Sequence, residues 1–212
     1  MNCTKPLFLS FSLSLFLFSS GMFAQTLEEY NKRKYEIGGW IGAANPMPGT
    51  PTVQVLDTAL GGGFYSRMPW PSIFYTEFGG GYTVFLSRSE RALTAIPLYA
   101  ALAYKIPSEL PIQFFVKAGG GSAYVVARPA DTARWNPLAY AGVEASFIAG
   151  RRIRIGVRLD YNKIIETNLD VPDRYRYPLA SPFDDPRLFN AANYRLQNVD
   201  FFYFGLTVGV LF

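Results

Sequence analysis

Hydrophobic residues recur at every second position through most of the chain beyond residue 35. The clearest run ends the chain, where one face of an extended segment carries Phe202, Phe204, Leu206, Val208, Val210 and Phe212. The other face carries Phe201, Tyr203, Gly205, Thr207, Gly209 and Leu211. Successive side chains of a β-strand point to opposite faces of a sheet, so this period of two predicts a strand with one uniformly apolar face.

The same alternation predicts eight strands. They cover residues 35–43, 53–65, 72–86, 92–106, 112–126, 138–148, 152–165 and 201–212. The first two carry the fewest markers of an outward apolar face, namely Tyr35, Ile37, Ile41, Leu56, Leu60 and Phe64. Pro97 lacks a backbone N–H, which predicts a bulge or a local break in the fourth strand.

Two kinds of connection alternate between these strands. Short turns marked by proline or glycine fall near residues 67–71, 107–111 and 149–151. Longer or more polar connections fall near 44–52, 87–90, 128–137 and 166–198. An up-and-down arrangement explains this alternation, because every second connection then lies at the same end, and both termini lie at the short-turn end.

The composition favours a membrane surface over water. Half of the residues are hydrophobic and 17% are charged, against about 25% in an average soluble domain. Beyond the first 24 residues no apolar run approaches the 18 that a transmembrane helix needs, so a membrane-spanning structure here would be a closed barrel. The predicted fold class is an all-β, eight-stranded antiparallel up-and-down transmembrane β-barrel. A soluble β-sandwich or lipocalin-like binder fits less well, since it needs polar outward faces.

The N-terminus has the order of an export signal. Lys5 precedes an apolar run over residues 7–18, and small residues follow up to Ala24. Twelve helical residues span about 18 Å, too short for a hydrocarbon core of about 30 Å. We therefore expect a signal peptide over 1–24, cleaved after Ala24 or, alternatively, before Met22. After the signal peptide we expect an N-terminal lead-in over residues 25–34 and the barrel over residues 35–212.

The inventory of reactive residues argues against catalysis. The chain has no histidine and one cysteine, Cys3, which removes His-based metal sites, thiol catalysis and Ser-His-Asp triads. We expect no enzyme activity, no catalytic residue, no cofactor and no metal. The net charge of +4 is dispersed, which gives no footprint for nucleic acid. Glycine clusters at 61–63, 79–81 and 119–121 lie inside alternating segments, where they predict strand curvature and not phosphate loops.

The inward faces of the strands carry charges of both signs. An eight-stranded barrel is just wide enough to be filled by side chains. We therefore predict a polar network in the lumen, formed by Glu36, Glu77, Lys105, Lys117, Glu144, Arg154, Arg158 and Asp160. Charges of mixed sign can pair and close the lumen. The alternative is a narrow channel for small polar or apolar solutes.

The connection over residues 166–198 is long for a loop and rich in proline, aromatic and charged residues. One hypothesis makes it an extracellular recognition surface for an unknown ligand. Its anchors would be Tyr175, Arg176, Tyr177, Phe183, Arg187, Phe189 and Tyr194. The alternative is a solvated, variable loop or a lid over the barrel mouth.

The last eleven residues, FYFGLTVGVLF, resemble the C-terminal strand of small single-chain outer-membrane barrels of Gram-negative-type bacteria. That group includes the OmpA transmembrane domain and OmpX-like proteins. The resemblance implies location in the bacterial outer membrane with loops at the cell surface, and contact with outer-membrane lipid. It also implies that the barrel-assembly machinery reads the terminal Phe212 as an assembly signal. The group has many functions, so the resemblance leaves a structural or surface-interaction role as an expectation.

Overall fold

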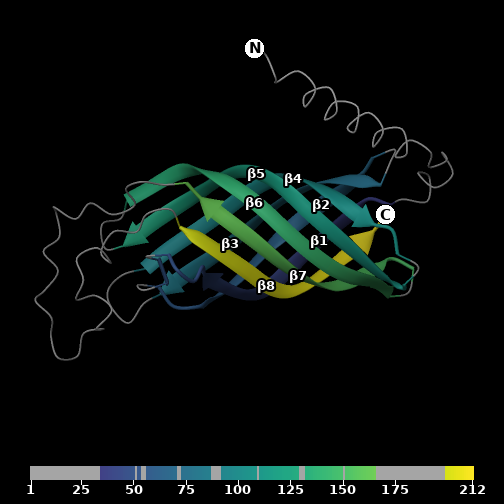
Figure 1. Ribbon diagram of the computed structural model, residues 1–212, viewed down its shortest axis with the longest axis horizontal. Helices are drawn as coiled ribbons and strands as arrows, with labels where there is room; N and C mark the ends of the chain where they lie inside the picture. Colours follow the sequence, from purple (N-terminus) through teal and green to yellow (C-terminus); the bar gives the residue numbers. More distant parts are fainter. Residues whose placement is uncertain are drawn as a thin grey trace, which may run out of the picture.

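Eight antiparallel strands form one closed barrel in the computed structural model (Figure 1). The structure describes residues 34–50, 52–53, 56–70, 73–86, 92–108, 110–128, 132–149, 151–165 and 199–212. The strands are β1 (Glu36–Pro46), β2 (Ala59–Pro69), β3 (Phe74–Leu86), β4 (Ala92–Ile106), β5 (Ile112–Arg128), β6 (Thr132–Ala149), β7 (Ile153–Ile164) and β8 (Asp200–Leu211). Each pairs with its sequence neighbours, and β1 closes the barrel by pairing with β8. The predicted eight-stranded, antiparallel, up-and-down fold is confirmed.

Most strand positions agree with the alternation, and β4 has the predicted bounds. The ladder between β3 and β4 is interrupted beside Pro97, where the paired residues pass from Gly80↔Leu98 directly to Thr83↔Ala95. The register is unchanged across the gap, so this is a local break and not a bulge. Strand β6 begins at Thr132, although we expected a connection up to 137. Its first residues mix polar Arg134 and Asn136 with Ala133 and Trp135, and they extend the pairing with β5 beyond the strand start that the sequence suggested.

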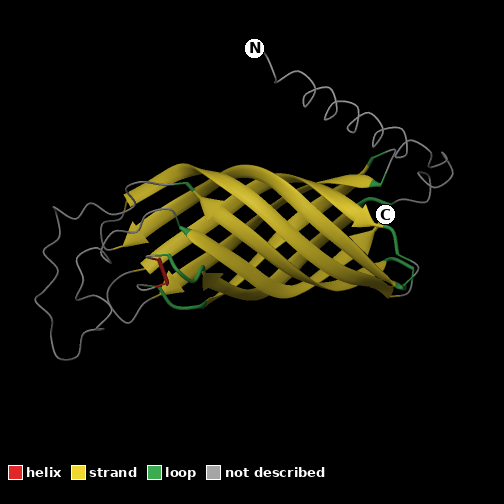
Figure 2. Cartoon of the chain, viewed as in Figure 1, coloured by secondary structure: helices red, strands yellow, loops and turns green. Residues whose placement is uncertain are grey.

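The position of Leu56 corrects the prediction for the second strand. Leu56 is buried with 2% of its surface exposed, and β2 starts only at Ala59. The backbone N–H of Leu56 donates to the carbonyl of Thr52 at 2.9 Å, and that of Asp57 donates to Leu86 at 2.9 Å. A short helical turn at 52–53, drawn red in Figure 2, thus directs Leu56 into the barrel mouth instead of outward.

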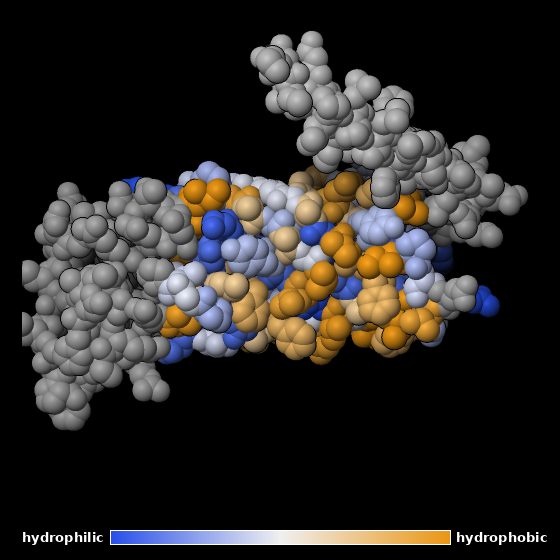
Figure 3. Space-filling model, viewed as in Figure 1, coloured by the Kyte–Doolittle hydropathy of each residue, from blue (hydrophilic) through white to orange (hydrophobic). Residues whose placement is uncertain are grey.

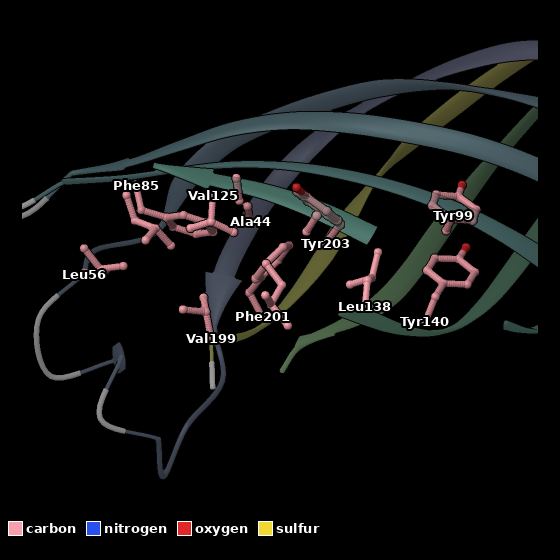
Figure 4. Close-up of a cluster of buried hydrophobic side chains, with 14 of the residues drawn as sticks. Ala44, Leu56, Phe85, Tyr99, Val125, Leu138, Tyr140, Val199, Phe201 and Tyr203 are labelled. Carbon is pink, nitrogen blue, oxygen red and sulfur yellow. The ribbon is translucent and has the colours of Figure 1, made fainter. Parts of the chain in front are cut away.

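The inside of the barrel has two layers. Towards the end where β1 and β2 connect, buried apolar side chains fill the lumen (Figure 4). They include Ala44, Leu56, Phe85, Leu93, Val125, Ile164, Val199 and Phe201. Phe85 and Phe201 meet edge to face with centroids 5.4 Å apart. The other half of the lumen, nearer the short connections, is charged.

The outside of the barrel is apolar over a broad band. Ile37, Leu60, Phe64, Leu206 and Phe204 are each more than half exposed. Figure 3 shows hydrophobic residues gathered over the middle of the visible face and towards the end where the C-terminus lies. The part of the chain that the structure describes contains no helix that is long and apolar enough to cross a membrane.

Candidate functional site: a charged network in the lumen

Arg67 is the centre of the charged layer. Its guanidinium is fully buried and contacts three glutamates from three other strands. It donates to Glu36 at 3.2 Å, to Glu77 at 2.6 and 3.1 Å, and to Glu144 at 2.7 and 3.3 Å. Because guanidinium is planar and presents several N–H donors in a fixed geometry, one arginine can hold carboxylates on several sides.

Two further cations link the same carboxylates. Lys117 lies 3.4 Å from Glu77, 3.2 Å from Glu144 and 3.4 Å from Asp160. Arg158 pairs with Asp160 on its own strand and reaches Glu77 at 3.3 Å. The network therefore joins β1, β2, β3, β5, β6 and β7 through the middle of the barrel.

Arg154 extends the network towards the short-connection end. It pairs with Glu36 and also donates to Gln113 at 2.8 Å. Four acidic side chains and four basic ones, all buried, thus compose this charged network: Glu36, Glu77, Glu144, Asp160, Arg67, Lys117, Arg154 and Arg158. An isolated buried charge is very unfavourable, and equal numbers of opposite charges are the arrangement that low-dielectric surroundings tolerate.

Tyrosines separate the charged network from the apolar layer. Tyr99 and Tyr140 stack with ring centroids 4.0 Å apart, and each hydroxyl lies 3.0 Å from Arg158. Tyr140 donates to Asp160 at 2.8 Å, and Tyr99 to Glu77 at 3.0 Å. Tyr65 donates to Glu36 at 2.7 Å. The Arg67 guanidinium also lies over the ring of Phe115, 4.3 Å from its centroid. Each tyrosine thus gives an apolar ring to one layer and a hydroxyl to the other.

Seven of the eight lumen residues expected from the sequence come together in this network. The exception is Lys105, which is half-buried near the short-connection end of β4, where its backbone N–H donates to Ile73 at 3.1 Å. Arg67, the most connected member, was missing from the expectation because Pro69 and Pro71 suggested a turn beginning at 67. Odd-numbered residues of this strand point inward, as Tyr65 does, so continuing the alternation by two residues would have identified Arg67.

The other predicted site residues have different outcomes. The loop anchors Tyr175, Arg176, Tyr177, Phe183, Arg187, Phe189 and Tyr194, and the leader over 1–24, lie outside the described residues. Phe212 is 67% exposed on the outer wall, and its backbone N–H donates to the carbonyl of Tyr35 at 2.9 Å.

The site's chemistry is that of ion pairing. No group of three or more His, Cys, Asp or Glu side chains suited to a metal ion occurs among the residues that the structure describes. Glu77 and Glu144 are instead bridged by Arg67 and Lys117.

Comparison with known proteins gives likenesses of fold only. No protein-family model matches the chain, and no curated protein matches it. Among solved structures, Neisserial surface protein A is similar at 13% identity and a TM-score of 0.48, over 84% of this chain and 96% of the other. The N-terminal β-barrel domain of Pseudomonas aeruginosa OprF is similar at 12% identity and a TM-score of 0.45, over 85% of this chain and 98% of the other. The outer membrane protein OprG from the same organism is similar at 9% identity and a TM-score of 0.46, over 85% of this chain and 97% of the other. It is the strand pairing of the chain itself that makes it a closed, eight-stranded antiparallel β-barrel.

Proposed function

We propose that this protein is a bacterial outer-membrane β-barrel with a closed lumen, serving a structural or surface-interaction role through its extracellular loops. The observation that carries the proposal is the inversion of polarity between its two faces: charged side chains are buried inside, and apolar side chains are exposed outside. A bilayer is the solvent that stabilises such a surface.

The outer face supports membrane insertion. Exposed aromatic side chains occur towards both ends of the apolar band, with Tyr35 and Trp70 at the short-connection end and Tyr82 and Trp135 towards the other. Aromatic residues at both interfaces flank the apolar band of outer-membrane barrels. In water the same band would be an aggregation surface far larger than a soluble monomer normally exposes.

The interior supports a closed lumen. Arg67, Lys117 and Arg158 are at most 1% exposed, and the carboxylates that they contact hold them in the middle of the barrel. The apolar layer adjoins this network, so a solute would meet ion pairs and then tightly packed aromatic rings. With the lumen blocked twice, the remaining surfaces available for function are the loops and the outer wall.

A surface-interaction role rests on the sequence of the 166–198 connection, whose proline, tyrosine and arginine content suits a recognition loop. We further propose that Phe212, exposed at the end of β8, is read by the barrel-assembly machinery. Neither role requires chemistry inside the barrel.

A narrow channel is the second candidate, and one observation favours it. Strand β7 presents polar side chains along most of its inner face, from Arg154 through Arg158 to Asn162. Buried atoms of all three, namely Nε, Nη1 and Oδ1 respectively, have no hydrogen-bond partner among the described residues. Such atoms could line a polar path.

Heat modifiability and bilayer conductance test the proposal together. We expect the mature protein folded in detergent to show a β-rich circular dichroism spectrum, to migrate differently on gels when unboiled, and to give no steady conductance in planar bilayers. Steady conductance would establish the channel instead. Absence of the gel shift, with solubility in detergent-free buffer, would refute the outer-membrane barrel.

A further inference from the structure

We propose that the outer wall over β5 to β8 holds one anionic phospholipid, with its headgroup at a basic corner beside the C-terminus and an acyl chain in an apolar hollow above it. This inference rests on the proposed membrane location. Two features of the described residues point to it independently, one of charge and one of shape.

The basic corner consists of Lys34, Arg151 and Arg152. All three side chains are exposed, and the Lys34 ammonium donates to the carbonyl of Arg151 at 3.4 Å, which places the start of the barrel against the β6–β7 turn. The Arg152 carbonyl accepts the backbone N–H of Leu211 at 2.7 Å, so the end of β8 lies at the same corner (Figure 1).

The positive charge of this corner exceeds its negative charge. Among the described residues there, the acidic side chain is that of Glu36, which is buried in the charged network. The three exposed basic side chains therefore have no exposed acidic side chain beside them among the described residues. The apolar residues Tyr35, Ile153 and Phe212 are each at least 46% exposed beside them, so the basic groups stand at the edge of the apolar band. Phosphate groups of lipids lie at this depth of a membrane.

An apolar hollow opens on the same wall. It has a volume of about 360 Å³, and Ala145 lies between the larger side chains of Phe114 and Val157, its partners in the two neighbouring ladders. Phe204 lines its β8 side. Val157 is five residues beyond Arg152, about 17 Å along an extended strand, so the hollow lies within the hydrocarbon region when the corner lies at the headgroups.

A second hollow of about 610 Å³ continues the first. Both are lined by Val116, Val143 and Leu159, and the second extends past Ala141 to Met47 and Pro48. Small side chains at 141 and 145 thus leave a depression that follows the wall away from the basic corner. Its direction suits an acyl chain whose phosphate is held by Arg151 and Arg152.

Native mass spectrometry of the full chain tests this site. The protein is folded in mild detergent with equal amounts of phosphatidylglycerol and phosphatidylcholine that carry the same acyl chains. We expect one phosphatidylglycerol to be retained in preference to phosphatidylcholine. Taking about fivefold for each basic residue near an anionic surface, the double variant R151Q/R152Q should lower that preference about 25-fold. The control R134Q/K163Q removes two charges at the opposite end of the barrel and should leave the preference for phosphatidylglycerol unchanged.

A pair of uncharged variants tests the hollow. Ala145→Leu should lower retention of both lipids, because the larger side chain fills the hollow. Thr76→Leu is the control: Thr76 points outward on β3, away from the hollow, so this change should not lower retention. Equal retention of the two lipids by the unaltered protein would overturn the proposal, as would equal effects of each variant and its control. Loss of the gel shift in the unaltered protein would instead refute the outer-membrane barrel, so the two failures are distinguishable.

Discussion

Arg67 of β2 and Glu144 of β6, 77 positions apart in the chain, meet inside the barrel through two hydrogen bonds of 2.7 and 3.3 Å. Both side chains are fully buried, and neither strand pairs with the other. The contact therefore spans the lumen, and it ties the N-terminal strands to the C-terminal ones.

Removing the central cation should destabilise the barrel strongly. Arg67→Met leaves Glu36, Glu77 and Glu144 with an excess of buried negative charge, and loss of one partner from a buried ion pair typically costs about 3–5 kcal/mol. Urea unfolding followed by gel mobility measures the change. Arg67→Lys keeps the charge but loses the planar fork, so its effect should be smaller. Equal stability of the Met variant and the unaltered protein would contradict the network's role.

The energy of the Arg67–Glu144 pair can be separated from the cost of an unpaired charge. In a double-mutant cycle, R67M/E144Q should be more stable than the sum of the two single changes predicts, because the second change removes one of the orphaned carboxylates. Additive free energies of unfolding would show that the two residues act independently.

Leu56 should contribute to stability as a core residue, although it lies in a connection. Leu56→Ala should cost about 2–4 kcal/mol in detergent by opening a gap in the apolar layer. Leu60→Ala is the matched control, because Leu60 is 73% exposed on the outer wall. If both variants unfold at the same urea concentration, the mouth is not sealed by Leu56.

The cost of placing a charged side chain on the outer apolar band should depend on its depth in the membrane. Leu206→Arg, near the middle of β8, should reduce folding into vesicles by an amount equivalent to about 2–4 kcal/mol. Trp135→Arg, near the start of β6, should cost about 0–1 kcal/mol because it lies near the interface. Folding yields on unboiled gels give the comparison, and equal yields would argue against a membrane around β8.

Glycines at the closing seam should be intolerant of side chains. Gly42 of β1 pairs with Gly205 of β8, and a Cβ on either would overlap the backbone of the opposite strand. Gly42→Val should therefore lower stability or yield of the closed barrel. Gly39→Ala has more room beside Gly63 and serves as the control. A fully stable Gly42→Val barrel would show that the seam can open to admit side chains.

The sequence alone predicts the eight strands because the outer face must be apolar and the period of two is visible wherever that face is long. It fails at the ends of strands. The register of Tyr65 implies that Arg67 points inward, but Pro69 and Pro71 concealed the continuation of β2. Leu56 has the parity of an outward residue, and only the three-dimensional path of its connection turns it inward.

The charged network shows a similar division. Inward parity identifies Glu77, Lys117 and Arg158, since each alternates with an outward apolar neighbour. The alternation shows which face a side chain occupies but not its position along the barrel axis. It therefore does not distinguish Lys105, near the end of β4, from the residues that meet at Arg67. Nor does it reveal that Tyr99 and Tyr140 stack, because that contact depends on the curvature of the closed sheet.

The origin of the network's members along the chain has a consequence for how the barrel is made. Glu36, Arg67 and Glu77 come from the first three strands, and their partners Lys117, Glu144 and Arg158 come from β5 to β7. Pairs between neighbouring strands, such as Arg67 with Glu36 and Glu77, can form in a half-built sheet, but pairs between the two groups, such as Arg67–Glu144, form only when the two edges approach. The pairs that cross the lumen therefore stabilise only the closed barrel, which makes closure more cooperative and leaves incomplete barrels less stable and more open to proteolysis.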